Sequence, residues 1–519
     1  MPTAPEEESK PALTAPTLDE MRELAAALSL EISQGDLEEY RDLLAGNLTR
    51  YEAVEAMVET KPAVKYPREP GHAPTAEEDP YNAWYWKTEI TGAKDGLLAG
   101  KRVSVKDTIS VAGVPMAAGA RPMEGFVPDI DATVVTRILD AGGIIAGKAQ
   151  SEGFSVGGAG HNSFNGPVRN PHDPTRSSGG SSSGSGALVA AKQVDMSIGG
   201  DQGGSVRLPA SWCGVYGLKP TRGLMPYTGV MQVDQTLDHI GPMANSARDV
   251  ALLLEATAGP DGLDPRQEHF TPKPYSQMLT GKVDGLRIGI LKDGFGYEGV
   301  SEPDVDASVL SAADHFRKLG AEVVDISVPA HRDGQSILVP IAVEGAYATL
   351  ILGNGMGYGW PGFYDTHLHE HFLGALPKRI NELSQSAKMF LLMGAYVHGK
   401  YRGRHYAKAQ NLARQLAAAY QDALQKVDLL LMPATPKKAN KLPPETCGPA
   451  ESVGRSFEMF VGTGGQFNLA GLPALTVPCA MSEGLPVGMM LIGQHYDDGV
   501  VLNAAHAFEE TTDWRTRHP

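Results

Sequence analysis

The chain has 519 residues, 42% of them hydrophobic and 20% charged, so it carries enough apolar material for a large buried core and is not a wholly disordered protein. Its 45 Lys and Arg against 61 Asp and Glu leave a net charge of -16 at pH 7, a field that repels phosphate backbones and excludes nucleic acid as a partner. The three cysteines, Cys213, Cys447 and Cys479, form no CxxC pair, so we expect neither a disulfide framework nor a zinc cluster.

Residues 1–60 predict an N-terminal helical segment. Thr17 and Glu20 form a capping-box pattern ahead of Met21 and Leu24, and a second helical stretch runs up to Gly46. The first ten residues, MPTAPEEESK, are acidic and lack the apolar run of a signal peptide, and no run of about 18 apolar residues follows anywhere. We therefore expect a soluble, cytoplasmic protein that does not associate with a membrane.

Residues 61–80 are rich in proline and charge, which is typical of an irregular linker on the surface. The main body, residues 81–519, follows this linker. Near its start, RVSVKD predicts a short strand with Val103 and Val105 on one face and Ser104 and Lys106 on the other. Lys106 is thus expected at the end of a strand.

Strands and helices alternate through the main body. The helix-like TVVTRILDAGG precedes the apolar run IIAGK, and RIGIL, VLSAADHFRKLG and AEVVDI repeat the alternation later. VDLLLMP and GMMLIG read as further buried strands. The fold class that this order predicts is α/β, one domain with a mixed twisted sheet of about ten strands flanked by helices.

Glycine is concentrated in two segments, residues 177–191 and 197–211. The first runs directly into the helix-forming ALVAAK, and a glycine-rich turn that opens a helix points backbone N–H groups into a cavity. In the second, Gly203 and Gly204 lead into Ser205, and their lack of side chains lets the backbone pack closely around a reacting atom. Such a turn suits an oxyanion hole.

Together these segments resemble the signature of the amidase signature family of serine hydrolases. The matching positions are Gly179, Gly180, Ser181, Ser182, Ser183, Gly184, Asp201, Gly203, Ser205, Arg207 and Pro209. The family's upstream lysine is matched in VKD, its GKxxxE stretch in GKAQSEGF, and its C-terminal pattern in FNLAGLPALTVP and GLPVGMMLIG. The resemblance covers residues 80 to 510 and is nearest to stand-alone bacterial amidases.

The resemblance implies a catalytic set of Lys106, Ser181 and Ser205. Ser205 would be the nucleophile, Lys106 the base, and Ser181, held on a cis peptide bond, the relay between them. The oxyanion hole would consist of backbone N–H groups of Gln202, Gly203, Gly204 and Ser205, with Ser182, Asp201 and Arg207 as supporting residues. A lysine can act as base only when it is neutral, which requires burial.

The reaction so implied is hydrolysis of a linear carboxylic amide to an acid plus ammonia or an amine through an acyl-enzyme, an activity on C–N bonds other than peptide bonds. Carbamate or ester hydrolysis by the same residues is an alternative, and so is a glutamine-amidase subunit of a transamidating complex. The expected partner is a small amide or carbamate, and a homodimer is one assembly that we consider. We expect no cofactor and no metal.

Two other patterns compete. Gly180 to Gly184 fits GxSxG, the nucleophile elbow of α/β-hydrolases, with Ser182 as nucleophile, but the preceding VRNPHDPTRSS contains no apolar strand. HLHEH, with His367, His369 and His371, invites a metal interpretation, yet it is not HExxH and alternate residues share a face only on a strand. A polar segment is the better interpretation of HLHEH.

Overall fold

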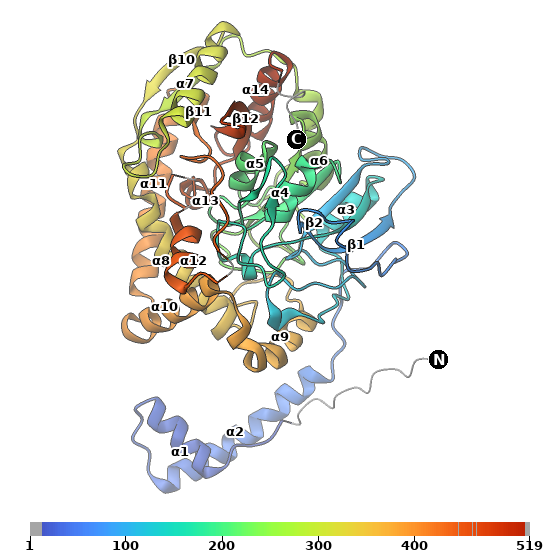
Figure 1. Cartoon of the computed structure of the whole chain (residues 1–519). Coiled ribbons are helices and arrows are strands. Elements are labelled where there is room, and N and C mark those ends of the chain that lie inside the picture. Colours follow the sequence, from blue (N-terminus) through green and yellow to red (C-terminus); the bar gives the residue numbers. More distant parts are fainter. Residues whose placement is uncertain (1–12, 445, 459, 463, 514–519) are drawn as a thin grey trace. The chain divides into compact units, whose positions relative to one another are not determined.

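An 11-stranded mixed sheet organises the main body of this computed structural model, which describes residues 13–444, 446–458, 460–462 and 464–513. The sheet confirms the predicted α/β class and has one strand more than the ten expected (Figure 1). In the order in which they lie side by side, its strands are β1 (Trp84–Thr91), β3 (Ile144–Ala149), β2 (Arg102–Lys106), β6 (Met196–Asp201), β8 (His239–Ala244), β7 (Tyr216–Lys219), β12 (Ala474–Ser482), β13 (Leu485–Ile492), β11 (Leu429–Pro433), β9 (Arg287–Leu291) and β10 (Glu322–Ile326).

Fourteen α-helices accompany these strands in the described part of the chain. They are α1 (Leu18–Ala27), α2 (Gln34–Glu55), α3 (Thr133–Asp140), α4 (Ser183–Ala190), α5 (Arg207–Cys213), α6 (Ala247–Thr257), α7 (Pro303–Lys318), α8 (Gly334–Tyr347), α9 (Thr366–Arg379), α10 (Gln385–Tyr401), α11 (Arg404–Leu424), α12 (Pro449–Glu458), α13 (Gln466–Ala470) and α14 (Asp498–Glu510). A separate hairpin consists of β4 (Arg169–Asn170) and β5 (Asp173–Ser177).

Parallel and antiparallel pairings coexist in the sheet. β2 runs parallel to both β3 and β6, and β9 runs parallel to both β10 and β11. Between these groups, β8, β7, β12 and β13 pair antiparallel. The carboxyl ends of the parallel strands β2 and β6 therefore meet at one edge of the sheet, which brings Lys106 and Asp201 to the same side of the molecule.

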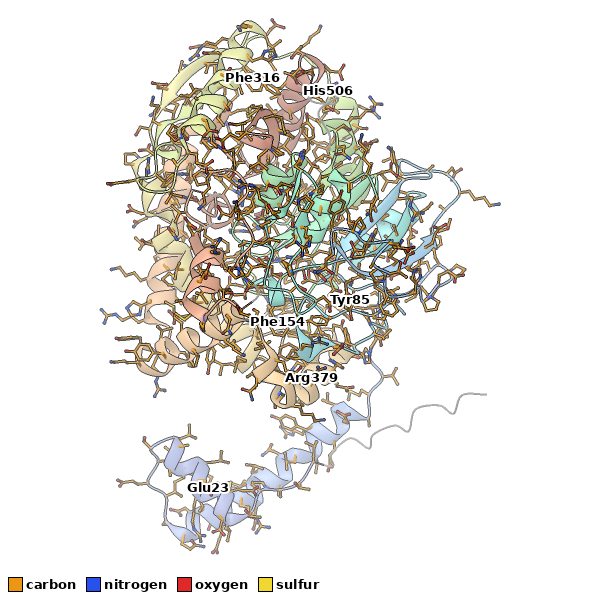
Figure 2. The ribbon with its side chains drawn as sticks, in the orientation of Figure 1. Glu23, Tyr85, Phe154, Phe316, Arg379 and His506 are labelled. Carbon is orange, nitrogen blue, oxygen red and sulfur yellow. The ribbon has the colours of Figure 1, made fainter. Side chains whose placement is uncertain are left out.

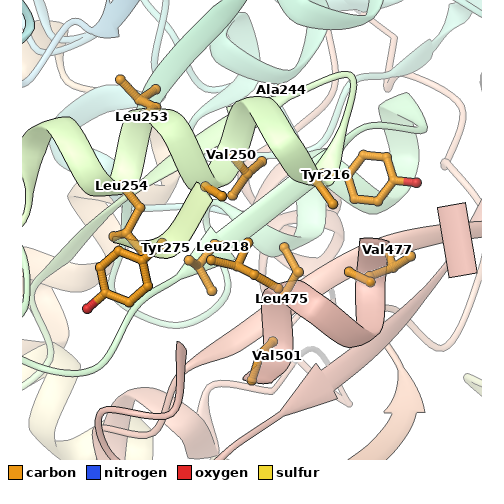
Figure 3. Packing of buried hydrophobic residues seen from close by; sticks show 14 of the residues in the cluster. Tyr216, Leu218, Ala244, Val250, Leu253, Leu254, Tyr275, Leu475, Val477 and Val501 are labelled. Atoms are coloured by element: carbon orange, nitrogen blue, oxygen red, sulfur yellow. The ribbon is translucent and has the colours of Figure 1, made fainter. Parts of the chain in front are cut away.

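The sheet has an apolar layer on each face, because successive strand residues point to opposite sides. In β11, Leu429 and Leu431 join a core with residues of α3, α6, α7 and α14, whereas Leu430 and Met432 join a core with α8, α11 and α13. The first core includes Phe316 of α7, and Figure 3 shows the part of it between α6, Tyr275 and β12 (Figures 2 and 3). A smaller core holds α4 and α5 against the central strands.

By its contacts the chain divides into two units, residues 1–62 and 63–519. In the first, Thr17 and Glu20 form the predicted capping box of α1. The second helix, α2, continues through Gly46 to Glu55, beyond the end predicted for it, because one interior glycine costs a helix only about 1 kcal/mol. The acidic stretch of residues 1–10 lies outside the described residues.

The proline-rich stretch predicted as a linker makes specific contacts within the second unit. The Arg68 guanidinium pairs with the Asp131 carboxylate, and Trp86 Nε1 donates to the Pro70 carbonyl at 2.7 Å. His72 forms an isolated backbone bridge with Lys87 of β1. Residues 63–80 thus follow the edge strand β1, which begins with Trp84 and also carries Trp86.

Among the described residues, one segment, Pro329–Leu352, is long and apolar enough to span a membrane by length and composition, with a mean hydropathy of 1.5 over an 18-residue window. Half of it is buried inside the fold, and its helix α8 packs against α10, α11 and α13. A core helix of this kind satisfies the same test of length and hydropathy, so the burial accounts for its apolar composition.

Candidate active site

Lys106 ends β2 with its side chain fully buried. Val103 and Val105 of the same strand point into the core with α3 and α6, so the predicted alternation of this strand is confirmed. Lys106 Nζ donates to Ser181 Oγ at 2.7 Å and to Ser155 Oγ at 3.0 Å. Burial lowers the pKa of Lys106 to about 7, although nearby carboxylates, Glu152 foremost, favour the ammonium form. The amine is therefore able to take up and return a proton near neutral pH.

Ser181 stands at the turn that opens α4. The Gly180–Ser181 peptide bond is cis, as the resemblance implies. A Cβ on Gly180 would lie 2.2 Å from Glu152 Oε2, so any larger residue there would have to displace the buried Glu152 carboxylate. Ser182 comes next and fastens the turn to β6, because its Oγ donates to the Gly200 carbonyl at 2.9 Å and accepts from the Gly200 N–H at 3.0 Å. Those two bonds commit the Ser182 hydroxyl to holding the backbone.

Ser205 lies between β6 and α5, on the second glycine-rich turn. Its carbonyl accepts a hydrogen bond from the Ser182 N–H at 3.3 Å, so the two turns lie against each other. The side chain is 2% exposed and contributes to the wall of a cavity. The fold thus brings Ser205 beside the turn that carries Ser181, and Ser181 in turn contacts the buried Lys106.

Asp201 and Arg207 hold the Ser205 turn in shape. Asp201 accepts hydrogen bonds from the N–H groups of Gly204 at 2.8 Å and Val206 at 3.0 Å, and from Arg207 Nη2 at 3.0 Å. Burial alone would raise the pKa of Asp201, but the Arg207 guanidinium and these hydrogen bonds hold it below its usual range. Arg207 also donates to the Gly464 carbonyl at 2.7 Å and to Asn468 Oδ1 at 2.6 Å.

The same bonds refine the expected oxyanion hole. Gly204 was predicted as one of its donors, but its N–H already donates to Asp201 Oδ1, so this N–H holds the turn together. Gln202, Gly203 and Ser205 line the cavity next to it. A developing oxyanion would therefore have to be met by the turn's other backbone N–H groups.

The cavity that Ser205 borders has a volume of about 240 Å³ and mostly apolar walls. The walls come from α8, α10 and the segment around α12, with Leu338, Val339, Met389, Met393 and Phe460 among them. Phe390 and Phe457 stack at 5.2 Å between ring centroids. None of the described residues that line the cavity is charged, so the space suits a neutral, apolar group.

Sequence reasoning missed these walls and the second partner of Lys106. Ser155 lies three residues beyond Glu152 of the quoted GKAQSEGF stretch, at a positive φ of 61° next to Phe154 (Figure 2). Glu152 itself is fully buried, accepts from the Asn162 side chain at 3.1 Å, and has a pKa that burial raises to about 7. The Glu of the GKxxxE stretch was the available signal for this second titratable group.

Other features of the sequence take no part in the contact between Lys106 and Ser181. Lys148 donates to the Ile109 carbonyl and lies 3.8 Å from Asp107. HLHEH belongs to helix α9, where alternate residues do not share a face, and the rings of His367 and His371 pack on Phe126. Among the described residues, no group of three or more His, Cys, Asp or Glu could hold a metal ion.

The structure around Ser182 also differs from that of an α/β-hydrolase nucleophile elbow. A short strand, β5, precedes the turn, but, as expected, it is not apolar, and it belongs to the two-stranded hairpin outside the main sheet. Because the Ser182 hydroxyl is bonded to Gly200 and is not among the residues that line the cavity, it is poorly placed to attack a substrate.

Comparison with known proteins adds four findings. The family model described as Amidase matches residues 74–502. An enantioselective amidase of Rhodococcus rhodochrous is 38% identical over 500 residues, which cover 96% of each chain. A glutamyl-tRNA(Gln) amidotransferase subunit of Methanosarcina acetivorans is 35% identical over 83% of this chain and 88% of its own. The crystal structure of the Thermotoga maritima protein of the same name superposes with a TM-score of 0.68 at 31% identity, covering 82% of this chain and 86% of that one.

Proposed function

The chain belongs to the Amidase family of amide-hydrolysing enzymes, and from this premise we propose that it hydrolyses a carboxylic amide to an acid plus ammonia or an amine, with Ser205 as the nucleophile. The observation that carries the proposal is the 2.7 Å hydrogen bond between the buried Lys106 Nζ and Ser181 Oγ beside the Ser205 turn. A serine hydroxyl attacks only when a base takes its proton, and a neutral lysine can serve as that base.

The proposed sequence begins with attack of Ser205 Oγ on the amide carbonyl. Its proton passes to Ser181, whose own proton passes to Lys106 Nζ. Backbone N–H groups of the 202–205 turn stabilise the oxyanion, an interaction whose loss costs about 100-fold or more in rate. The lysine then returns the proton through Ser181 to the leaving nitrogen, and water releases the acid from the acyl-enzyme by the reverse route.

The cavity favours an amide of an apolar acid over free glutamine. Glutamine carries an ammonium and a carboxylate, and burying both without charged partners is costly. The described residues that line the cavity offer no charged partner, whereas its aromatic and aliphatic walls fit a hydrocarbon or aryl group. We therefore rank the stand-alone amidase above the glutamine-amidase subunit of a transamidating complex, with carbamates and esters as further substrates of the same site.

A panel of purified substrates tests this proposal. It should contain an aryl-substituted primary amide, an aliphatic amide, an anilide, a carbamate and glutamine, each at matched concentration. We expect turnover of the apolar amides and none of glutamine. Turnover of glutamine, together with partner subunits that copurify with the chain, would support the transamidating alternative, and turnover of carbamates alone would replace the amide assignment. Light scattering on the same preparation tests whether the chain forms the homodimer considered above.

A further inference from the structure

The side chain of Gln202 makes two hydrogen bonds that the proposed reaction does not use. Its Nε2 donates to the Tyr227 hydroxyl at 2.9 Å and to Asp238 Oδ1 at 3.0 Å. Both protons of the amide nitrogen are thereby engaged. Gln202 nevertheless lines the cavity next to Ser205, so its side chain connects a buried polar cluster to the space in which a substrate would lie.

The Tyr227 hydroxyl shows which terminal atom of the Gln202 side-chain amide is the nitrogen and which is the oxygen. Tyr227 has a single hydroxyl proton, which it donates to the Met231 carbonyl at 3.2 Å, so its oxygen must accept the bond from Gln202. Asp238 likewise accepts from the Val233 N–H at 3.1 Å and offers Gln202 a carboxylate oxygen. The amide oxygen Oε1 is therefore the atom turned away from this cluster.

Gln202 Oε1 is buried and has no hydrogen-bond partner in the described structure. The residue is only 8% exposed. A buried carbonyl oxygen without a donor costs about 1–3 kcal/mol, which native structures rarely leave unmet except where a ligand or water completes the bond. Gln202 as a residue lines the cavity, so a donor on whatever the cavity binds is the partner that we consider for this buried oxygen.

The position of the Gln202 amide relates it to the reacting groups. A Cβ built on Gly200 would lie 3.4 Å from Lys106 Nζ and 3.9 Å from Gln202 Nε2. The lysine and the glutamine amide therefore flank the same point of β6. In an apolar amide the only donors are the N–H groups of the nitrogen that is to be expelled, and that nitrogen must approach the relay that protonates it.

We propose that Gln202 is a substrate-binding residue whose Oε1 accepts a hydrogen bond from the N–H of the amide to be cleaved, and that this bond makes the site prefer amides with an N–H over esters. This inference rests on the proposed function. An ester has no hydrogen at the corresponding oxygen, so it leaves Oε1 unpaired. Sites built to hydrogen-bond a substrate N–H discriminate strongly against analogues that lack it.

The test compares kcat/KM for a primary amide and for the methyl ester of the same acid. The variants are Gln202→Met, which removes the acceptor, and Gln335→Met, which removes another glutamine of the same cavity wall. We expect the ratio of amide to ester kcat/KM to fall about 10-fold or more in Gln202→Met, because one hydrogen bond to the amide alone is lost. In Gln335→Met the ratio should stay within about twofold of the native ratio.

Equal losses for amide and ester in Gln202→Met would overturn the inference, since the glutamine would then only support the turn. If that variant does not fold, Tyr227→Phe decides, because Tyr227 holds the Gln202 amide without lining the cavity. A fall in the ratio in Tyr227→Phe supports the inference, and an unchanged ratio rejects it. If the native protein turns over neither compound, the proposed function itself is refuted. If the native protein is active and the ratio of amide to ester kcat/KM is unaltered in the variants, only the role of Gln202 is refuted.

Discussion

Lys106 Nζ lies 2.7 Å from Ser181 Oγ, although 75 positions of sequence separate the two residues. The sheet creates this contact, because β2 is parallel to β6 and the α4 turn is fastened to β6 through Ser182 and Gly200. Both side chains are fully buried. A proton exchanged between them is therefore protected from bulk water, and this protection underlies the predictions that follow.

The rate of amide hydrolysis should rise with pH through about 7. Only the neutral Lys106 amine can act as base, and burial lowers its pKa to about 7. Below that pH the ammonium form predominates and kcat/KM should fall about tenfold per pH unit. A profile of kcat/KM between about pH 5 and about pH 9, a range that brackets the pKa of this amine, checks the prediction. A profile that falls across this range would exclude Lys106 as the base.

Glu152→Gln should move the acidic limb of that profile to lower pH. The Glu152 carboxylate is the largest of the charges that raise the pKa of Lys106, so its removal favours the neutral amine at a lower pH. We expect a displacement of about 0.5 pH unit or more. Glu124→Gln is the matched control, because Glu124 pairs with Arg379 near the surface and should leave the limb in place. A shift to higher pH in Glu152→Gln would contradict the electrostatic account.

Lys106→Ala should impair amide hydrolysis more than hydrolysis of an activated ester. The amide's leaving nitrogen needs the proton that Lys106 returns, whereas a good leaving group departs without it. We expect a loss of about 1,000-fold or more for the amide. Ser205→Ala provides the comparison, because loss of the nucleophile should affect both substrates alike. Equal losses in Lys106→Ala would remove the lysine from leaving-group protonation.

Asp201→Asn should destabilise the fold as well as the site. It leaves the fully buried Arg207 guanidinium without its carboxylate, which typically lowers the free energy of unfolding by about 3–5 kcal/mol. Urea denaturation of this variant, with Glu322→Gln at the exposed Arg287 pair as control, measures the difference. The control should lose less than about 1 kcal/mol. A loss in Asp201→Asn no larger than in the control would show that the buried pair does not hold the turn.

The contribution of the Asp201–Arg207 pair to the free energy of unfolding should also depend on pH. The folded pKa of Asp201 lies below its unfolded value of about 3.9, so its contribution is complete above that pH and is lost as the pH falls towards the folded pKa. Denaturation of the native protein and of Asp201→Asn should therefore converge in acid. Divergence in acid would mean that another carboxylate controls the acid transition.

Local sequence patterns predicted the elements that carry the reacting groups. The alternation in RVSVKD placed Lys106 at a strand end, the first glycine-rich segment predicted a turn that opens a helix, and the second predicted a close-packed turn; the resemblance placed Ser181 and Ser205 on these turns. These features depend on neighbouring residues and on glycine's access to backbone forms that other residues avoid. They could therefore be predicted from the sequence with the aid of the family pattern.

The remaining parts of the site depend on packing between distant segments. Phe390 of α10 and Phe457 of α12 stack on each other in the cavity wall, and nothing near either residue in the sequence marks it as part of the cavity that Ser205 borders. The hydrogen bond from the Gly204 N–H to Asp201 could not be predicted either. The sequence of a glycine-rich turn does not indicate which of its N–H groups face inward. The packing of the His367 and His371 rings on Phe126 is a further long-range contact that the histidine-rich pattern did not reveal.

The most direct measurement of the central claim is the site at which the enzyme becomes acylated. Protein quenched with acid during turnover of an activated ester of an apolar acid is analysed by intact mass and by peptide mapping. The account predicts one acyl group on Ser205, retained in Ser182→Ala and absent in Ser205→Ala. An acyl group on Ser182, or acylation that persists in Ser205→Ala, would contradict it.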